Sequence, residues 1–314
     1  MGAHSGLYRS DGQISLIAAA AVVALELRQL ADGRAGARIS TAAAAQNDTT
    51  VWKTDGQYTM PKASGYELLD GLPAYWDHSA GVATWRKVND RDYFLGTVVG
   101  DVANATLTCL IDLNVQPVWE IDLRQGLWTS EATDGLGVTS LFGGGVKLAF
   151  DAVAEVAQAA LYSERTLPIA SNPIMMVRFA VVDNGDNAAL DIDIGLAIGS
   201  HATDFEAITE FVAFHLDGDT LDLDAHSDDG TTDVAPTDTT VNLVEGTYVE
   251  VWIDARVPTA IKLYVDGVRV LSGTTFTLGA ATGPVKAILH MEKTSDDTPA
   301  ELRVVELKVK TSEQ

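Results

Sequence analysis

The stretch Leu190-Asp-Ile-Asp-Ile-Gly-Leu-Ala-Ile198 alternates aliphatic residues with polar or small ones without a break. Successive side chains of a β-strand point to opposite faces of the sheet, so the aliphatic residues at positions 190, 192, 194, 196 and 198 share one face. A long strand with a single apolar face is typical of two antiparallel sheets packed face to face. The stretch therefore predicts a β-sandwich in this part of the chain.

Further strands of this kind are expected at residues 248–253, 261–270, 285–291 and 302–309. The second range contains Asp266-Gly267, and this dipeptide supplies the positive φ angles that a tight hairpin turn requires. Residues 154–161 are the one segment that we expect to form a short helix.

The first half of the chain carries shorter strands, expected at residues 23–28, 49–54, 57–60, 73–76, 95–99 and 106–113. Short strands separated by turns such as Asp32-Gly33 and Asp55-Gly56 are typical of a small β-barrel or β-sandwich. The sequence therefore predicts an all-β protein in which a small barrel or sandwich precedes a larger sandwich.

Strand length and charge density change part-way along the chain, and we place the domain boundaries there. Residues 1–12 are a polar, Gly-rich N-terminal arm, residues 13–114 the first domain and residues 138–314 the second. Residues 115–137 follow a looser pattern, which fits either an interdomain linker or the first edge of the next domain. Trp119 and Trp128 argue against a fully solvated tether.

The net charge of the chain excludes some classes of binding partner. The formal charge is −23, with 10 basic and 16 acidic residues up to Asp134 and 11 and 28 beyond it. Such a surface repels phosphate backbones and anionic headgroups, so we expect no nucleic acid and no membrane as partner. The apolar run of residues 14–25 is too short to span a bilayer and is expected to form one or two buried strands.

Cys109 is the only cysteine, which excludes an intramolecular disulfide. It lies in the alternation Leu107-Thr-Cys-Leu-Ile111, where a buried and inert thiol is expected.

Three motifs follow one another in the first half: Gly56-Gln-Tyr-Thr-Met-Pro-Lys62, Ala74-Tyr-Trp-Asp77 and Leu95-Gly-Thr-Val98. In this order they resemble the phage capsid cement, or head decoration, family over about residues 13–113. In structural terms we expect the first motif to form a Pro-Lys turn at a sheet edge and the second to form an aromatic core strand. We expect the glycine of the third motif to lie at a close approach of two backbones. The resemblance implies a structural protein of the outer capsid surface that binds the major capsid protein, and we expect it to do so as a homotrimer.

The second half carries Glu250-Val-Trp-Ile-Asp254 followed by Ile261-Lys-Leu-Tyr-Val-Asp-Gly267. This pair of strands resembles the concanavalin A-like, laminin G-like jelly-roll sandwich over about residues 138–312. That sandwich hosts lectins, glycanases and inert spacers alike, so the resemblance implies a fold and no single function.

The best candidate for catalysis is Glu120-Ile-Asp-Leu-Arg-Gln125, which resembles the acidic strand of retaining β-glucanases. In those enzymes the alternation places a nucleophile and an acid/base on one sheet face. Gln125 stands at the acid/base position and cannot donate and recover a proton. We therefore expect a plain edge strand and no enzyme activity.

Metal and cofactor sites are not expected. None of the six histidines (His4, His78, His201, His215, His226 and His290) has a second histidine or the cysteine at zinc-ligand spacing. The run Phe142-Gly-Gly-Gly145 is interpreted as a tight bend at the start of a strand rather than a phosphate loop. Two acidic clusters are calcium candidates, one through Asp217 and Asp219 and one through Asp228 and Asp229, with solvated turns as the alternative.

The sequence thus predicts a non-enzymatic virion protein, a capsid decoration protein without a cofactor. The alternative is a carbohydrate-binding module that adheres to a host surface glycan without catalysis. An exposed aromatic platform would favour that alternative, but Trp252 lies inside a strand alternation and is expected to pack in the interior.

Overall fold

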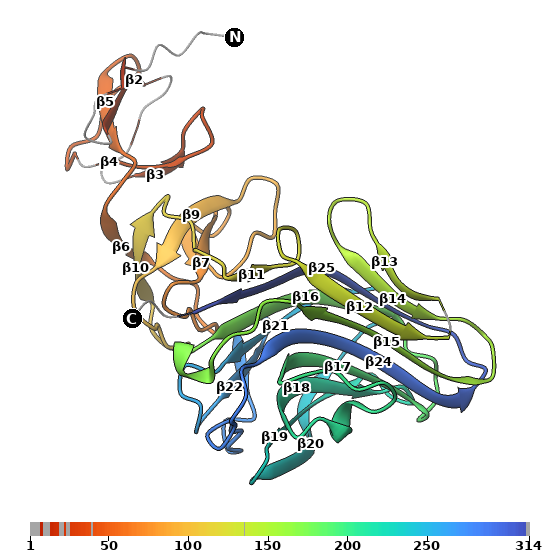
Figure 1. Cartoon of the computed structure of the whole chain (residues 1–314). Coiled ribbons are helices and arrows are strands. Elements are labelled where there is room, and N and C mark those ends of the chain that lie inside the picture. Colours follow the sequence, from red (N-terminus) through yellow and green to blue (C-terminus); the bar gives the residue numbers. More distant parts are fainter. Residues whose placement is uncertain are drawn as a thin grey trace. The chain divides into compact units, whose positions relative to one another are not determined.

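The computed structural model describes residues 7–8, 13–18, 22, 26–38, 40–134 and 136–311. The chain divides into two compact units, Met1–Pro117 and Val118–Gln314 (Figure 1). Besides strands, the described residues contain two three-residue 3-10 helices, η1 (Ile169–Ser171) and η2 (Phe205–Ala207). The all-β prediction is confirmed. Neither of these helices has the length needed to cross a membrane.

The first sheet of the first unit has the strand order β1-β2-β5-β4-β3. It has a small core of its own, in which Trp52 is buried with Ile14, Val22 and Leu30. The indole N–H of Trp52 donates to the Thr50 hydroxyl at 2.9 Å, so the buried ring keeps a hydrogen-bond partner. The strands are β1 (Leu7–Tyr8), β2 (Gln13–Ile17), β3 (Leu27–Gln29), β4 (Ala35–Arg38) and β5 (Thr49–Lys53).

The second sheet of the first unit has the order β6-β10-β9-β7-β8 and contains the three motifs of the first half. Its strands are β6 (Gln57–Pro61), β7 (Pro73–Asp77), β8 (Val82–Thr84), β9 (Tyr93–Val98) and β10 (Thr108–Leu113). A Cβ on Gly96 would lie 2.0 Å from the carbonyl oxygen of Asp112 on the neighbouring strand. The close backbone approach predicted for this glycine is therefore confirmed.

The second unit is a sandwich of an eight-stranded and a seven-stranded sheet. The eight-stranded sheet has the order β13-β14-β25-β16-β21-β22-β23, with β11 paired to β25. Its strands are β11 (Ile121–Asp122), β13 (Gly137–Ser140), β14 (Val146–Phe150), β16 (Ile174–Asp183), β21 (Val249–Asp254), β22 (Lys262–Val265), β23 (Val268–Val270) and β25 (Ala300–Lys310).

The seven-stranded sheet has the order β12-β15-β24-β17-β18-β19-β20. Its strands are β12 (Trp128–Thr133), β15 (Glu155–Ser163), β17 (Leu190–Ala197), β18 (Glu210–Asp217), β19 (Asp222–Asp229), β20 (Asp233–Asn242) and β24 (Lys286–Asp296). Leu190, Ile192, Ile194 and Leu196 point from β17 into one core shared with the facing sheet. Burying each such side chain stabilises the fold by about 1.5–3 kcal/mol. The predicted jelly-roll sandwich is confirmed.

The prediction of a helix at residues 154–161 is wrong, because all but the first of these residues belong to strand β15. Its alanines have high helix propensity, but β15 pairs with β12 on one side and β24 on the other. Both faces of the strand are buried, so the segment shows no polar alternation. Tertiary pairing overrides the local preference.

Several predicted segments lie partly outside the described residues. Of the N-terminal arm, residues 7–8 are described and pair with β2. Of residues 14–25, the described part holds most of β2 and the bridge from Val22 to Ala44. Within residues 115–137, β11 and β12 are strands of the second unit.

Candidate functional site

The acidic strand considered for catalysis does not keep its alternation. Glu120 donates its backbone N–H to the carbonyl of Val309, and Ile121–Asp122 pairs with β25. The chain then turns, because the N–H groups of Gln125 and Gly126 both bond the carbonyl of Asp122. Glu120, Asp122 and Gln125 therefore do not share one sheet face.

The four calcium candidates lie at opposite ends of the β18–β19 hairpin. Asp217 ends β18 and its carboxylate accepts the N–H of Asp219 in the turn. Asp228 and Asp229 end β19, beside the start of β18. The Asp229 carboxylate accepts the N–H groups of Thr231, Thr232 and Ala280 and the hydroxyl of Thr277. The Asp229 oxygens thus join the turn after β19 to the segment before β24.

Trp252 and Cys109 are both buried, as predicted. The indole N–H of Trp252 donates to Glu250 at 2.7 Å, and its ring packs against Tyr264, so Trp252 offers no platform to a sugar. Burial raises the pKa of the Cys109 thiol to about 11, and Lys62 opposes this shift only in part. The thiol is therefore unreactive at neutral pH. The run Phe142–Gly145 forms the predicted turn, between β13 and β14.

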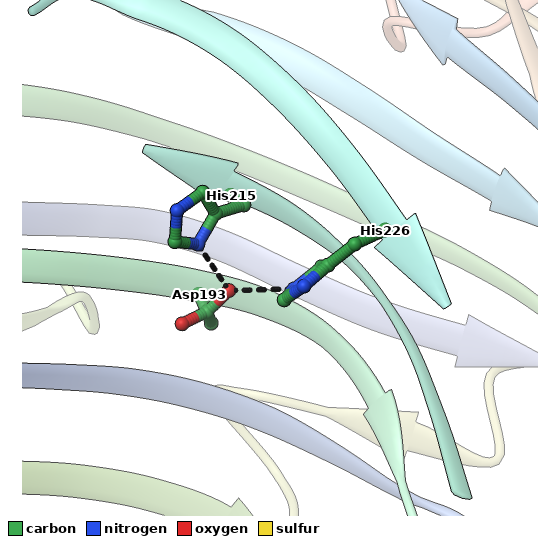
Figure 2. A group of neighbouring side chains, drawn as sticks. All are labelled: Asp193, His215 and His226. Atoms are coloured by element: carbon green, nitrogen blue, oxygen red, sulfur yellow. Dashed lines mark hydrogen bonds and ion pairs between the residues drawn. The ribbon is translucent and has the colours of Figure 1, made fainter. Parts of the chain in front are cut away.

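The structure brings together two histidines that the sequence left apart. Asp193 on β17 faces His215 on β18 directly in the strand register, and His226 lies on β19, the next strand. Figure 2 shows both imidazoles pointing at one carboxylate oxygen of Asp193. The distances to Asp193 Oδ1 are 3.0 Å from His215 Nδ1 and 2.8 Å from His226 Nε2. Only 1% of Asp193 and 1% of His226 is exposed to solvent.

Each imidazole has a second carboxylate beside its other nitrogen. His215 Nε2 lies 3.8 Å from Asp191 Oδ1, and His226 Nδ1 lies 3.6 Å from Glu206 Oε1. Asp191 shares the outer face of β17 with Asp193 because the two are separated by one inward residue. Glu206 comes from η2, in the loop between β17 and β18. The cluster is thus an alternating row of carboxylates and imidazoles.

The loop that carries Glu206 is anchored on the outer face of the seven-stranded sheet. Phe205 is buried there with Phe211, and its backbone N–H donates to the Glu292 carboxylate at 2.7 Å. The Phe205 ring also stacks on His226, with ring centroids 5.6 Å apart. These contacts hold Glu206 beside His226 and fix the plane of the imidazole.

The electrostatics of the cluster follow from these contacts. Burial alone would raise the pKa of Asp193, but the charge of His226 and the hydrogen bonds from both imidazoles hold it well below its usual range. Burial would lower the pKa of His215, but the hydrogen bond to Asp193 and the negative charge of Asp193 outweigh the effect of burial and raise this pKa to about 9. The pKa of His226 is raised in the same way. Burial raises the pKa of Asp191 to about 7.

A pocket of about 320 Å³ opens on the His215 side of the cluster, and one of about 250 Å³ opens on the His226 side. Glu206 lines both. The acidic residues that line the larger pocket are Asp191, Asp193, Asp204, Glu206, Asp217 and Glu292. No Lys or Arg lines either pocket among the described residues. The arrangement therefore favours a cation.

The first unit places its sequence motifs within one sheet and the turns around it. The turn expected at the Pro-Lys pair is wrong, because Pro61 ends the edge strand β6 and Lys62 forms a bridge to Ala83. Lys62 is buried, and its ammonium donates to the carbonyl of Ala63 at 2.7 Å. Asp77 ends the aromatic strand β7 and accepts the N–H groups of Ser79 and Ala80. Gly96 lies in β9, two strands away from β6.

Residues 9–113 match the phage cement protein family. This range contains all three motifs and ends at the last residue of β10, so the resemblance seen in the sequence is confirmed. The second unit lies outside the match.

Among solved structures, the chain is similar to one from work on endo-acting O-glycanases that prominent members of the human gut microbiota express. The identity is 12% and the TM-score 0.47, over 62% of this chain and 100% of that one. It is also similar to the carbohydrate recognition domain of Emp46p in its potassium-bound form, with 13% identity and a TM-score of 0.40 over 58% and 87% of the two chains. A third similar structure is LamAcat of Zobellia galactanivorans, with 13% identity and a TM-score of 0.39 over 53% of this chain and 77% of that one. These similarities are too weak to carry a functional argument. No curated protein matches the chain.

Proposed function

We propose that the chain is a phage capsid decoration protein whose first unit binds the major capsid protein and whose second unit projects from the outer surface of the shell. The observation that carries the proposal is the match of residues 9–113 to the phage cement protein family, with its three motifs in order. The role is structural and needs no catalytic residue.

Shell stabilisation follows from mass action. A protein that binds the assembled shell and not the free subunits stabilises the shell by about 2.7 kcal/mol per site when its free concentration is 100 times its Kd. Copies that bridge neighbouring capsid proteins add such contributions over the lattice. We propose a homotrimer over threefold or quasi-threefold positions, because closed symmetry of this kind matches the symmetry of the lattice.

The charge distribution supports the orientation. Most of the acidic excess lies beyond residue 134, whereas the first half carries 10 basic and 16 acidic residues. Strongly acidic copies repel one another when they are crowded, so the more acidic unit is better placed away from the lattice.

Co-sedimentation with capsids that lack this chain tests the proposal. We expect the full chain to bind to saturation and to raise the temperature at which the shell disassembles. A fragment of residues 118–314 keeps the sandwich core and serves as the matched control. It should neither bind nor compete. Absence of binding by the full chain, or equal binding by the fragment, would contradict the proposal.

A further inference from the structure

We propose that Asp193, His215 and His226 bind one divalent first-row transition-metal ion, with Zn²⁺ as its occupant. This site goes beyond the proposed capsid role and does not depend on it.

The three ligand atoms already stand close together. Asp193 Oδ1, His215 Nδ1 and His226 Nε2 lie within 4.8 Å of one another, and the two N···O distances are 3.0 and 2.8 Å. Zinc bonds nitrogen and carboxylate oxygen at about 2.0–2.2 Å, so tetrahedral ligands are about 3.3–3.6 Å apart. The two N···O distances are therefore within about 1 Å of the spacing that the metal requires.

The surroundings of the two imidazoles match those of metal-binding histidines. Such a histidine usually donates its other ring N–H to a carboxylate, which fixes the tautomer and the ring orientation. Here the far nitrogens face Asp191 and Glu206 at 3.8 and 3.6 Å. Each imidazole therefore has a carboxylate beside its far nitrogen, slightly beyond hydrogen-bond distance, although the two carboxylates come from different elements.

The site also has room and charge for an ion. Two imidazoles and one carboxylate leave coordination positions open, and the pocket of about 320 Å³ beside Asp193 and His215 gives access to them. The acidic lining of that pocket offsets the charge of a divalent cation. Imidazole nitrogens suit zinc and its neighbours, whereas calcium and magnesium prefer oxygen ligands, so the donor set selects a transition metal.

Titration of the full chain with Zn²⁺ tests the site after removal of bound metal with a chelator. Metal binding displaces the hydrogens between Asp193 and the imidazoles, so we would work at about pH 8. We expect one Zn²⁺ per chain, and we expect Ca²⁺ and Mg²⁺ not to compete. His215→Gln and His226→Gln should each weaken binding more than about 100-fold, and Glu206→Gln about 10- to 100-fold. His78→Gln, in the first unit, should leave the affinity unchanged.

A second measurement on the unaltered chain keeps the test decisive if a histidine variant does not fold. Zinc-edge X-ray absorption should show nitrogen and oxygen ligands at about 2.0–2.1 Å with the outer-shell scattering of two imidazoles. No stoichiometric binding, a spectrum without imidazole, or affinity retained in the His215→Gln His226→Gln double variant would overturn the proposal. The cluster would then be a hydrogen-bonded charge network alone.

Discussion

The side chain of Asn114 links the two sheets of the first unit. Its side-chain oxygen accepts the N–H of Ala35 at 2.8 Å, and its side-chain nitrogen donates to the carbonyls of Ala35 and Thr54 at 2.9 and 2.7 Å. Asn114 also has a left-handed backbone, with φ of 60°. Ala35 belongs to the first sheet and Asn114 follows the last strand of the second, so this side chain links the two sheets, in addition to the contact between β4 and β9.

We expect Asn114→Ala to lower the free energy of unfolding by about 1–3 kcal/mol, because it leaves the backbone groups of Ala35 and Thr54 without these partners. Asn47→Ala is the matched control, since Asn47 has the same left-handed conformation (φ 69°) but is exposed. Urea unfolding followed by tryptophan fluorescence measures both. Equal losses in the two variants would show that backbone strain, and not the hydrogen bonds, sets the cost.

The cluster around Asp193 shows what sequence reasoning misses at the scale of residues. His215 and His226 are separated by ten residues and match no metal-ligand spacing, so the sequence predicts no metal site at them. Their proximity comes from the register of β17 with β18 and of β18 with β19. One signal in the sequence points to the cluster: Asp193, His215 and His226 each take the outward position in an alternation whose inward positions are mostly apolar.

At the scale of elements, the β18–β19 hairpin holds the segment before β24 through two buried carboxylates. Glu210 and Asp229 are opposite each other in the register. Glu210 accepts the N–H groups of Thr282 and Gly283, and Asp229 accepts that of Ala280. Burial alone would raise both pKa values, but these hydrogen bonds outweigh it and lower them. Both groups therefore stabilise the fold above their unfolded pKa values, and this contribution is lost as the pH falls through the lower folded values.

We expect Asp229→Asn to lower the free energy of unfolding by about 1–3 kcal/mol at neutral pH, because an amide cannot accept on both sides. The difference from the unaltered chain should shrink as the pH falls below about 4. Chemical unfolding at a series of pH values measures it, with the exposed Asp233→Asn as control. A difference that stays constant down to low pH would exclude the carboxylate as the cause.

The elements themselves were predicted unequally well. Strands with a clean alternation, such as β17 and the β22–β23 hairpin at Asp266-Gly267, were found because one face is apolar and the turn residues have positive φ. β15 was mistaken for a helix because both of its faces are buried. The pattern that identifies a strand disappears when neighbours cover it on both sides.

At the scale of the whole molecule, each of the two units has its own hydrophobic core and its own set of functional candidates. The first unit contains the range that matches the phage cement protein family, and the second contains the larger sandwich, the Asp193 cluster and most of the acidic excess. Order and type of the motifs were readable from the sequence. The homotrimer stays a prediction, because symmetric contacts between copies leave no periodic signal in one chain.

Electron cryo-microscopy of capsids prepared without this chain and then saturated with it tests whether the chain decorates the outer surface of the shell. We expect added density on the outer surface, at threefold or quasi-threefold positions, with the first unit against the shell and the sandwich pointing outward. A bare outer surface at saturation, or density attached to the shell through the sandwich, would contradict it.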